Sequence, residues 1–135
     1  MKKLLLMLVL SVSLLANYTV SDSNYIYQKT SKDVFVTMIY DDGFEFLYSN
    51  TDLYMDENTP VIIFVDNVKL YGFSKKDSFI EFFDPSNKLV ELCKKQNKAQ
   101  IIILDTDGEL IFDDYISLSG YTKAFDSLVD DLYGF

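Results

Sequence analysis

Asp105, Asp107 and Glu109 are the residues whose spacing comes closest to a metal-binding pattern in this chain. They alternate along an Asp-x-Asp-Gly-Glu sequence, and Ca²⁺ is held in proteins by several carboxylate and carbonyl oxygens. A loop of the EF-hand type would also need an acid at its twelfth position, where this chain has Ile116. A tight hairpin turn explains the same residues, because Asp and Gly are favoured in turns. We favour the turn, keep a weak calcium-binding module as an alternative, and expect no resident metal or other cofactor.

Catalytic groups of the usual kinds are missing. The chain has no histidine and no arginine, so it lacks an imidazole base and a bidentate clamp for carboxylate or phosphate. Two acid pairs, Asp41–Asp42 and Asp113–Asp114, have the type of residue used in acid–base catalysis. Both pairs fall at expected turns or strand ends, where water keeps carboxylates ionised. We therefore expect no catalytic residues and no enzymatic activity.

Cys93 is the single cysteine, so no internal disulfide can form. It has helical spacing with Leu89 and follows Leu92, which favours a buried packing role. Lys94 and Lys95 follow it directly and would lower the pKa of an exposed thiol. A reactive thiol at Cys93 is therefore the alternative.

The loop over residues 49–59 is long for a small domain, and such loops are often functional. It is polar and acidic and carries Tyr54 with Asp56 and Glu57. Tyr is enriched in protein interfaces, where its rigid ring adds contact area and its hydroxyl a polar tip. We regard these three residues as binding candidates; the alternative is that Tyr54 belongs to the rim of a small core.

Residues 1–16 have the layout of a secretory signal peptide. Lys2 and Lys3 precede an apolar run that is too short to cross a bilayer comfortably, since a spanning helix needs roughly 20 apolar residues. We expect cleavage near Ala16 rather than a membrane anchor. A basic start with a compact apolar core is typical of bacterial Sec signals, so the expected location is the periplasm, with no membrane association after cleavage.

Strong acidity characterises the remaining 119 residues. With Lys2 and Lys3 removed, ten basic residues face 21 acidic ones, which gives a net charge of −11. Nucleic acid is excluded as a partner because phosphate binding needs concentrated positive charge. A basic periplasmic protein is the favoured partner on electrostatic grounds, although acidity can also serve solubility alone.

The hydrophobic pattern divides the chain into an N-terminal arm and one globular domain. Residues 17–33 are polar and predict a flexible arm or a weak edge strand, with Tyr25-Ile26-Tyr27 as the strand candidate. The domain follows over residues 34–135. Apolar runs on either side of Asp-rich turns predict three hairpins. They cover residues 34–48, 61–73 and 101–113.

The strands Val61–Val65 and Ile101–Leu104 contain only apolar residues, which predicts central positions covered on both faces. Capping-box spacings predict helical structure from Lys75 to Asn97, in two parts that meet at Asp84-Pro85. An apolar stripe at helical spacing predicts a last helix from Tyr121 to Tyr133. The expected fold is therefore α+β: a mostly antiparallel sheet built from hairpins, with two or three helices packed on it.

The segment Ile101-Ile102-Ile103-Leu104-Asp105-x-Asp107-Gly108-Glu109-Leu110-Ile111 is followed by an amphipathic helix that ends at Leu132. Residues 100–133 thereby resemble the C-terminal part of thioredoxin-like proteins, and Pro60–Val65 is similar to their central strand. The family's Cys-x-x-Cys is absent after Val65, and Ala99-Gln100 stands in place of its proline. The resemblance implies a thioredoxin-like α/β fold as the alternative, and a redox-inactive or atypical thiol protein using Cys93.

Three functions follow from these residues. The first is a small, acidic, exported, non-enzymatic protein that binds another protein as an inhibitor, immunity factor or accessory subunit. The second is the atypical thiol protein, and the third is the calcium-binding module.

Overall fold

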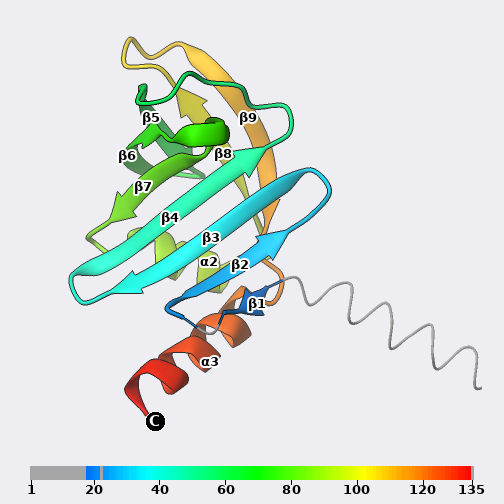
Figure 1. Cartoon of the computed structure of the whole chain (residues 1–135), viewed down its shortest axis with the longest axis vertical. Helices are drawn as coiled ribbons and strands as arrows, with labels where there is room; N and C mark the ends of the chain where they lie inside the picture. Colours follow the sequence, from blue (N-terminus) through cyan, green and yellow to red (C-terminus); the bar gives the residue numbers. More distant parts are fainter. Residues whose placement is uncertain (1–17, 22, 135) are drawn as a thin grey trace, which may run out of the picture.

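One antiparallel sheet of nine strands dominates the chain, whose structure is a computed structural model describing residues 18–21 and 23–134. The sheet curls into a half-barrel (Figure 1). In spatial order, its strands are β1 (Thr19–Val20), β2 (Tyr25–Lys29), β3 (Asp33–Tyr40), β4 (Gly43–Asn50), β7 (Ile80–Asp84), β6 (Val68–Ser74), β5 (Pro60–Val65), β8 (Lys98–Leu104) and β9 (Leu110–Ser117).

Three tight hairpins supply six of these strands and confirm the predicted ones: β3–β4, β5–β6 and β8–β9. Their turn residues explain where the chain reverses. Asp66 has a φ of 50°, a conformation that Asp tolerates. In the β8–β9 turn, Asp105 Oδ1 accepts the backbone N–H groups of Asp107 and Glu109, each at 2.9 Å.

The sheet curls around a row of aromatic rings on its concave face, which we call the inner face. Phe46 stacks on Phe82 with ring centroids 5.4 Å apart, and Phe35 stacks on Phe46 at 5.7 Å. All three rings are buried and lie on three neighbouring strands. The curl goes far enough for the Tyr18 hydroxyl, just before β1, to donate to the Ser117 carbonyl at the end of β9 at 2.7 Å.

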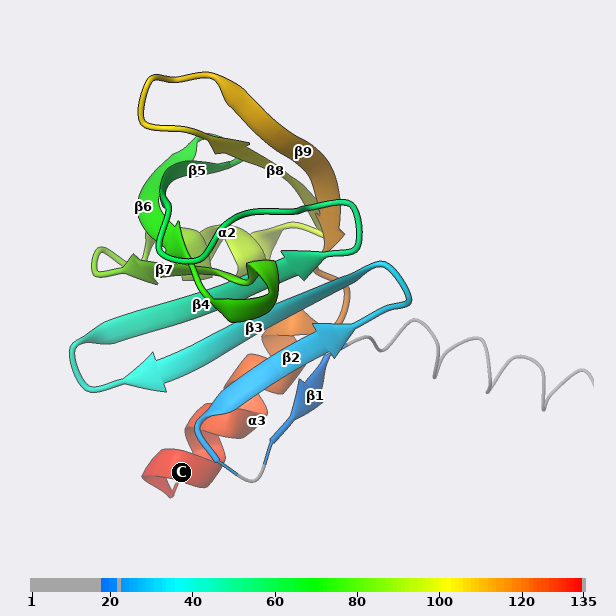
Figure 2. The same ribbon diagram turned by 45° about the horizontal axis from the view of Figure 1, so that its top comes forward.

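Two helices complete the core on the inner face (Figure 2). α3 (Tyr121–Tyr133) packs against β1 and β2, while α2 (Lys88–Lys95) contacts α3 and β7. The predicted bounds of the last helix are confirmed, and its apolar stripe is buried from Tyr121 to Leu128, whereas Leu132 is exposed. The N-terminus of α2 is held by Asp84, a buried strand residue whose Oδ2 accepts the N–H groups of Leu89 and Val90 at 2.9 and 3.2 Å.

The expected α+β fold is wrong. The protein is mostly antiparallel β, with 48% of its described residues in strands and 21% helical, and a curled nine-stranded half-barrel with two helices replaces the expected α+β arrangement of hairpins and packed helices. The thioredoxin-like α/β alternative is also wrong, because every strand pair in the described part of the chain is antiparallel.

The largest local error concerns residues 75–97. Residues 76–78 form a short 3₁₀ turn, η1 (Lys76–Ser78), and residues 80–84 form β7, the middle strand of the sheet. Only α2 is helical there. Ile80, Phe82 and Asp84 face inward while Glu81 and Phe83 face outward, so burial alternates with the period of a strand. The capping-box spacing therefore predicted the wrong element.

Two other expectations need correction. β5 and β8 lie toward one side of the sheet rather than at its centre, and each has one row of side chains that stays partly exposed. In the expected arm, the strand candidate Tyr25-Ile26-Tyr27 does form part of β2, but β2 pairs with β1 on one side and β3 on the other, so it is not an edge strand. The predicted signal peptide, residues 1–16, lies outside the described residues. Among the helices that the structure describes, none has the length and apolarity to span a membrane.

Gly72 permits the close approach of β6 and β7. A Cβ at this position would lie 2.3 Å from the Glu81 carbonyl oxygen and 2.9 Å from Ile63 Cδ1. We therefore expect Gly72→Ala to lower the free energy of unfolding by about 3 kcal/mol, because backbone would have to move. Chemical denaturation measures the change. Gly108→Ala is the matched control: no atom lies within 4 Å, so only its φ of 87° resists the substitution, at about 1 kcal/mol. Equal losses in the two variants would contradict this account.

Candidate functional site

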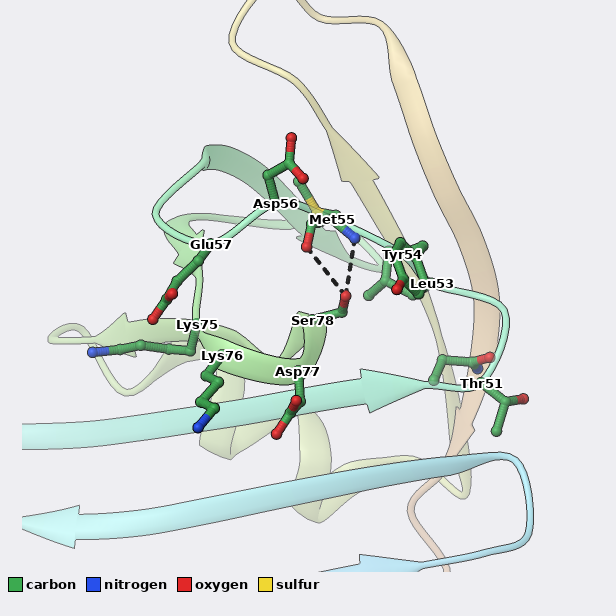
Figure 3. A pocket seen from close by; sticks show the side chains of 11 residues that line it. Thr51, Leu53, Tyr54, Met55, Asp56, Glu57, Lys75, Lys76, Asp77 and Ser78 are labelled. Carbon is green, nitrogen blue, oxygen red and sulfur yellow. Dashed lines mark hydrogen bonds between the residues drawn. The ribbon is translucent and has the colours of Figure 1, made fainter.

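A groove of about 560 Å³ lies between the loop over residues 51–59 and η1 (Figure 3). The loop connects β4 to β5, and η1 connects β6 to β7. The groove is thus built from two connections that are distant in sequence. Its lining residues are Asn50, Thr51, Leu53, Tyr54, Met55, Asp56, Glu57, Lys75, Lys76, Asp77 and Ser78.

The first half of the loop is fixed by a turn and by burial. Asn50 ends β4, and its carbonyl accepts the Leu53 N–H at 3.0 Å while its side-chain oxygen accepts the Asp52 N–H at 2.9 Å. This turn directs the Leu53 side chain into the core, where it is buried. Because Leu53 points inward, the next residue, Tyr54, faces solvent.

Two serines hold the second half of the loop. The Ser78 hydroxyl accepts the Met55 N–H at 2.9 Å and donates to the Met55 carbonyl at 3.2 Å (Figure 3). The buried Ser74 hydroxyl accepts the Thr59 N–H at 2.9 Å and donates to the Asp56 carbonyl. Each serine hydroxyl thus makes two hydrogen bonds to the backbone of the loop, one as acceptor and one as donor. These bonds hold the loop on a defined path over the sheet.

The backbone around the groove is unusually strained. Asn58, Asp77 and Ser78 have φ values of 65°, 62° and 60°. They make up three of the five non-glycine residues with positive φ in the described part of the chain. Asn and Asp tolerate this conformation, so the cost of order 1–3 kcal/mol applies mainly to Ser78, and residues under such strain tend to gather at functional sites. The Ser78 hydroxyl contacts Met55 from this strained position.

Tyr54, Asp56 and Glu57, the three binding candidates from the loop, all line this groove. Tyr54 is 94% exposed, so its ring is presented to solvent by a tethered loop. Sequence reasoning missed the opposite wall, which adds Lys75, Lys76, Asp77 and Ser78. Figure 3 shows Glu57 and Lys75 extending toward the same end of the groove.

Asp105, Asp107 and Glu109 are not part of the groove. They lie in the β8–β9 turn, where Asp105 accepts backbone N–H groups of the turn itself. Within residues 18–21 and 23–134, no group of three His, Cys, Asp or Glu side chains has an arrangement suited to a metal ion. The turn thus accounts for these residues, and no observation favours the calcium-binding module.

Cys93 lies on α2 and is 1% exposed. Burial raises the pKa of its thiol well above the ordinary range, and the nearby Asp84 carboxylate raises it further. Lys94 and Lys95 do not offset these effects. The structure therefore offers no observation in favour of a reactive thiol.

A pair of carboxyl groups on the outer face, the convex side of the sheet, was not predicted. Glu45 on β4 is diagonal to Glu81 on β7, because Glu45 stands opposite Phe83 and Glu81 opposite Leu47. A hydrogen bond to Glu81, with burial and the Glu81 charge, raises the pKa of Glu45 to about 7. The same hydrogen bond, together with Lys75, lowers the pKa of Glu81. Only the alternating pattern of residues 80–84 could have revealed this pair, whereas the capping-box spacing predicts a helix there.

No protein-family model matches this chain, and no curated protein or solved structure matches it significantly. The site is therefore interpreted from its own geometry.

Ser74→Ala should lower the free energy of unfolding by about 2 kcal/mol, because the Thr59 N–H and the Asp56 carbonyl would lose a buried partner. Hydrogen exchange at Thr59 should also accelerate. Ser127→Ala, exposed on α3, serves as the control and should change stability by less than about 0.5 kcal/mol. Unchanged exchange at Thr59 in Ser74→Ala would show that the serine does not hold the loop.

Glu45→Gln should make the protein melt higher than wild type at pH 8 but not at pH 5. The folded pKa of Glu45 lies above its usual 4.5, so its contribution to stability is fully present below pH 4.5 and is lost as pH rises through about 7. The amide of Gln stays neutral at every pH. Since both carboxyls are partly exposed, we expect a difference of about 2–4 °C at pH 8.

Melting curves of wild type, Glu45→Gln and the control Glu109→Gln between pH 5 and 8 test this expectation. Glu109 is exposed on the β8–β9 turn, so its substitution removes one carboxylate of the same kind outside the pair. The same pH profile for Glu45→Gln and Glu109→Gln would mean that the effect does not come from the Glu45–Glu81 pair.

Proposed function

We propose that this chain is an exported, non-enzymatic protein that binds another protein through the groove beside Tyr54. The observation that carries the proposal is the exposure of the Tyr54 side chain, which is 94%. The residues on either side of Tyr54 are fixed, because Leu53 is buried and Met55 is hydrogen-bonded to Ser78. An aromatic residue whose backbone is held in place before binding loses less conformational entropy on contact, and aromatic residues are enriched among the residues that dominate the energetics of interfaces.

Binding is favoured over catalysis by the groove's own groups. Catalysis by a hydroxyl nucleophile needs an adjacent base. The hydroxyls of Ser74 and Ser78 are instead bonded to backbone groups of the loop, and the chain has no histidine.

Export and charge support the choice of partner. The sequence of residues 1–16 indicates secretion to the periplasm, and the exported chain would carry a net charge of −11. A partner with a basic surface is attracted by this charge. In the groove, Asp56, Glu57 and Asp77 can pair with basic residues of such a partner, while Lys75 and Lys76 set its orientation.

The experiment replaces Tyr54 with the photo-reactive amino acid p-benzoyl-phenylalanine in the full chain, expressed and exported in living cells. Irradiation should give one discrete adduct with a second protein, because the ring lies in the interface. A second substitution, Tyr54→Ala in a chain carrying the crosslinker at Glu57, should weaken the same adduct at least about tenfold, the loss expected when a hot-spot ring is truncated.

The matched control carries the crosslinker at Tyr133, an exposed tyrosine at the end of α3. That position should give no adduct of the same mass. An adduct from Tyr133 and none from Tyr54 would contradict the proposed surface, and the absence of adducts at all three positions would argue against a protein partner.

A further inference from the structure

The outer face of β4, β6 and β7 contains a second cavity, of about 280 Å³, which does not share residues with the groove. It is lined by Glu45, Tyr71, Phe73, Glu81, Phe82 and Phe83. Three of its aromatic side chains are notably exposed: Tyr71 by 68%, Phe83 by 40% and Phe73 by 39%. We call these three rings with Glu45 and Glu81 the aromatic–acid pocket.

Strand register places rings and acids side by side in this pocket. Phe73 on β6 stands opposite Glu81 on β7, and Phe83 on β7 stands opposite Glu45 on β4. Tyr71 lies two residues before Phe73 and so projects from the same face. Each carboxyl group thus has an aromatic ring as its direct neighbour, the combination that attracts an ammonium group through charge and through the ring face.

The chain's own lysines already bind to this surface. Lys75 Nζ lies 3.0 Å from Glu81 Oε2 and 4.9 Å from the centroid of the Phe73 ring. Lys69 Nζ lies 5.5 Å from the centroid of the Tyr71 ring. Lys75 therefore demonstrates that an ammonium group can contact a ring and a carboxylate of the pocket together. Among the described residues, no lysine forms an ion pair with Glu45 or lies over the Phe83 ring, although the charge of Lys75 acts on Glu45 from a longer distance.

We propose that the aromatic–acid pocket binds a lysine side chain of a partner protein, with the ammonium between Glu45 and Glu81 and the aliphatic stem against Phe73 and Phe83. Charge complementarity identifies the occupant, because two carboxyl groups line the pocket in a chain with 21 acidic and 12 basic residues. This goes beyond the proposed function, since it concerns another face and does not involve Tyr54.

Binding of a lysine should be linked to pH. Glu45 is faced by Glu81 from β7, Tyr40 from β3 and Lys75 after β6, and it shares a proton with Glu81. An arriving ammonium takes the place of that proton, which leaves to solvent. The pocket should therefore bind lysine more tightly at pH 8 than at pH 6.

The test uses two tripeptides, Ac-Gly-Lys-Gly-NH₂ and its uncharged analogue with norleucine in place of lysine. Each is titrated into the ¹⁵N-labelled full-length exported protein, and backbone amide signals are followed. The lysine peptide should shift signals of residues 71–73 and 81–83 with saturation, and the norleucine peptide should not. Lys75→Met should tighten binding two- to fivefold, because it removes the internal competitor. Glu81→Gln should weaken it.

Lys76→Met is the matched control, since it removes the same charge from the neighbouring residue. Both lysines line the groove, but only Lys75 contacts Glu81 and the Phe73 ring of the pocket. Lys76→Met should leave the affinity unchanged, and so should Tyr54→Ala. Equal shifts with both peptides, shifts spread over all acidic residues without saturation, or no gain in Lys75→Met would each overturn the proposal. The outcome of the crosslinking experiment at Tyr54 does not affect the outcome of this peptide titration, so the two proposals can fail separately.

Discussion

The stack of Phe35, Phe46 and Phe82 is the contact on which the rest of the structure depends. Three large rings side by side on the inner face require depth, and the sheet supplies it by curling around them. The curl brings the ends of the sheet together, so that Tyr18 bonds to Ser117. Lys32 and Asn50 likewise meet Asp114 on β9. In a flat sheet these polar groups would lie too far apart to form the two hydrogen bonds and the ion pair.

β7 links this core to the groove and to the aromatic–acid pocket. Its inward residue Phe82 belongs to the stack, and its last residue, Asp84, holds the N-terminus of α2. Its outward residues Glu81 and Phe83 are two of the five residues of the aromatic–acid pocket. Because η1 leads directly into β7, the position of this strand also sets where Ser78 can hold the loop over residues 51–59. The groove and the pocket therefore share a support, and Lys75, which lines the groove, contacts Glu81 and Phe73 of the pocket.

The candidate site could be predicted only in part. Tyr54, Asp56 and Glu57 were identifiable because the length and acidity of their loop are local properties of the sequence. Ser74 and Ser78 were not, because a serine that bonds to a loop some 20 residues away leaves no local pattern. Asp105, Asp107 and Glu109 resembled a ligand set because turns and calcium loops use the same residue types.

The sequence by itself determined the three tight hairpins, the last helix and the burial of Cys93, since each depends on residues close together in the chain. Only the tertiary structure decided the order of the strands, the curl and the place of residues 80–84 in the middle of the sheet. Those residues carry capping-box spacing and strand alternation at once, and the free edges of β4 and β6, which offer backbone hydrogen bonds on both sides, select the strand.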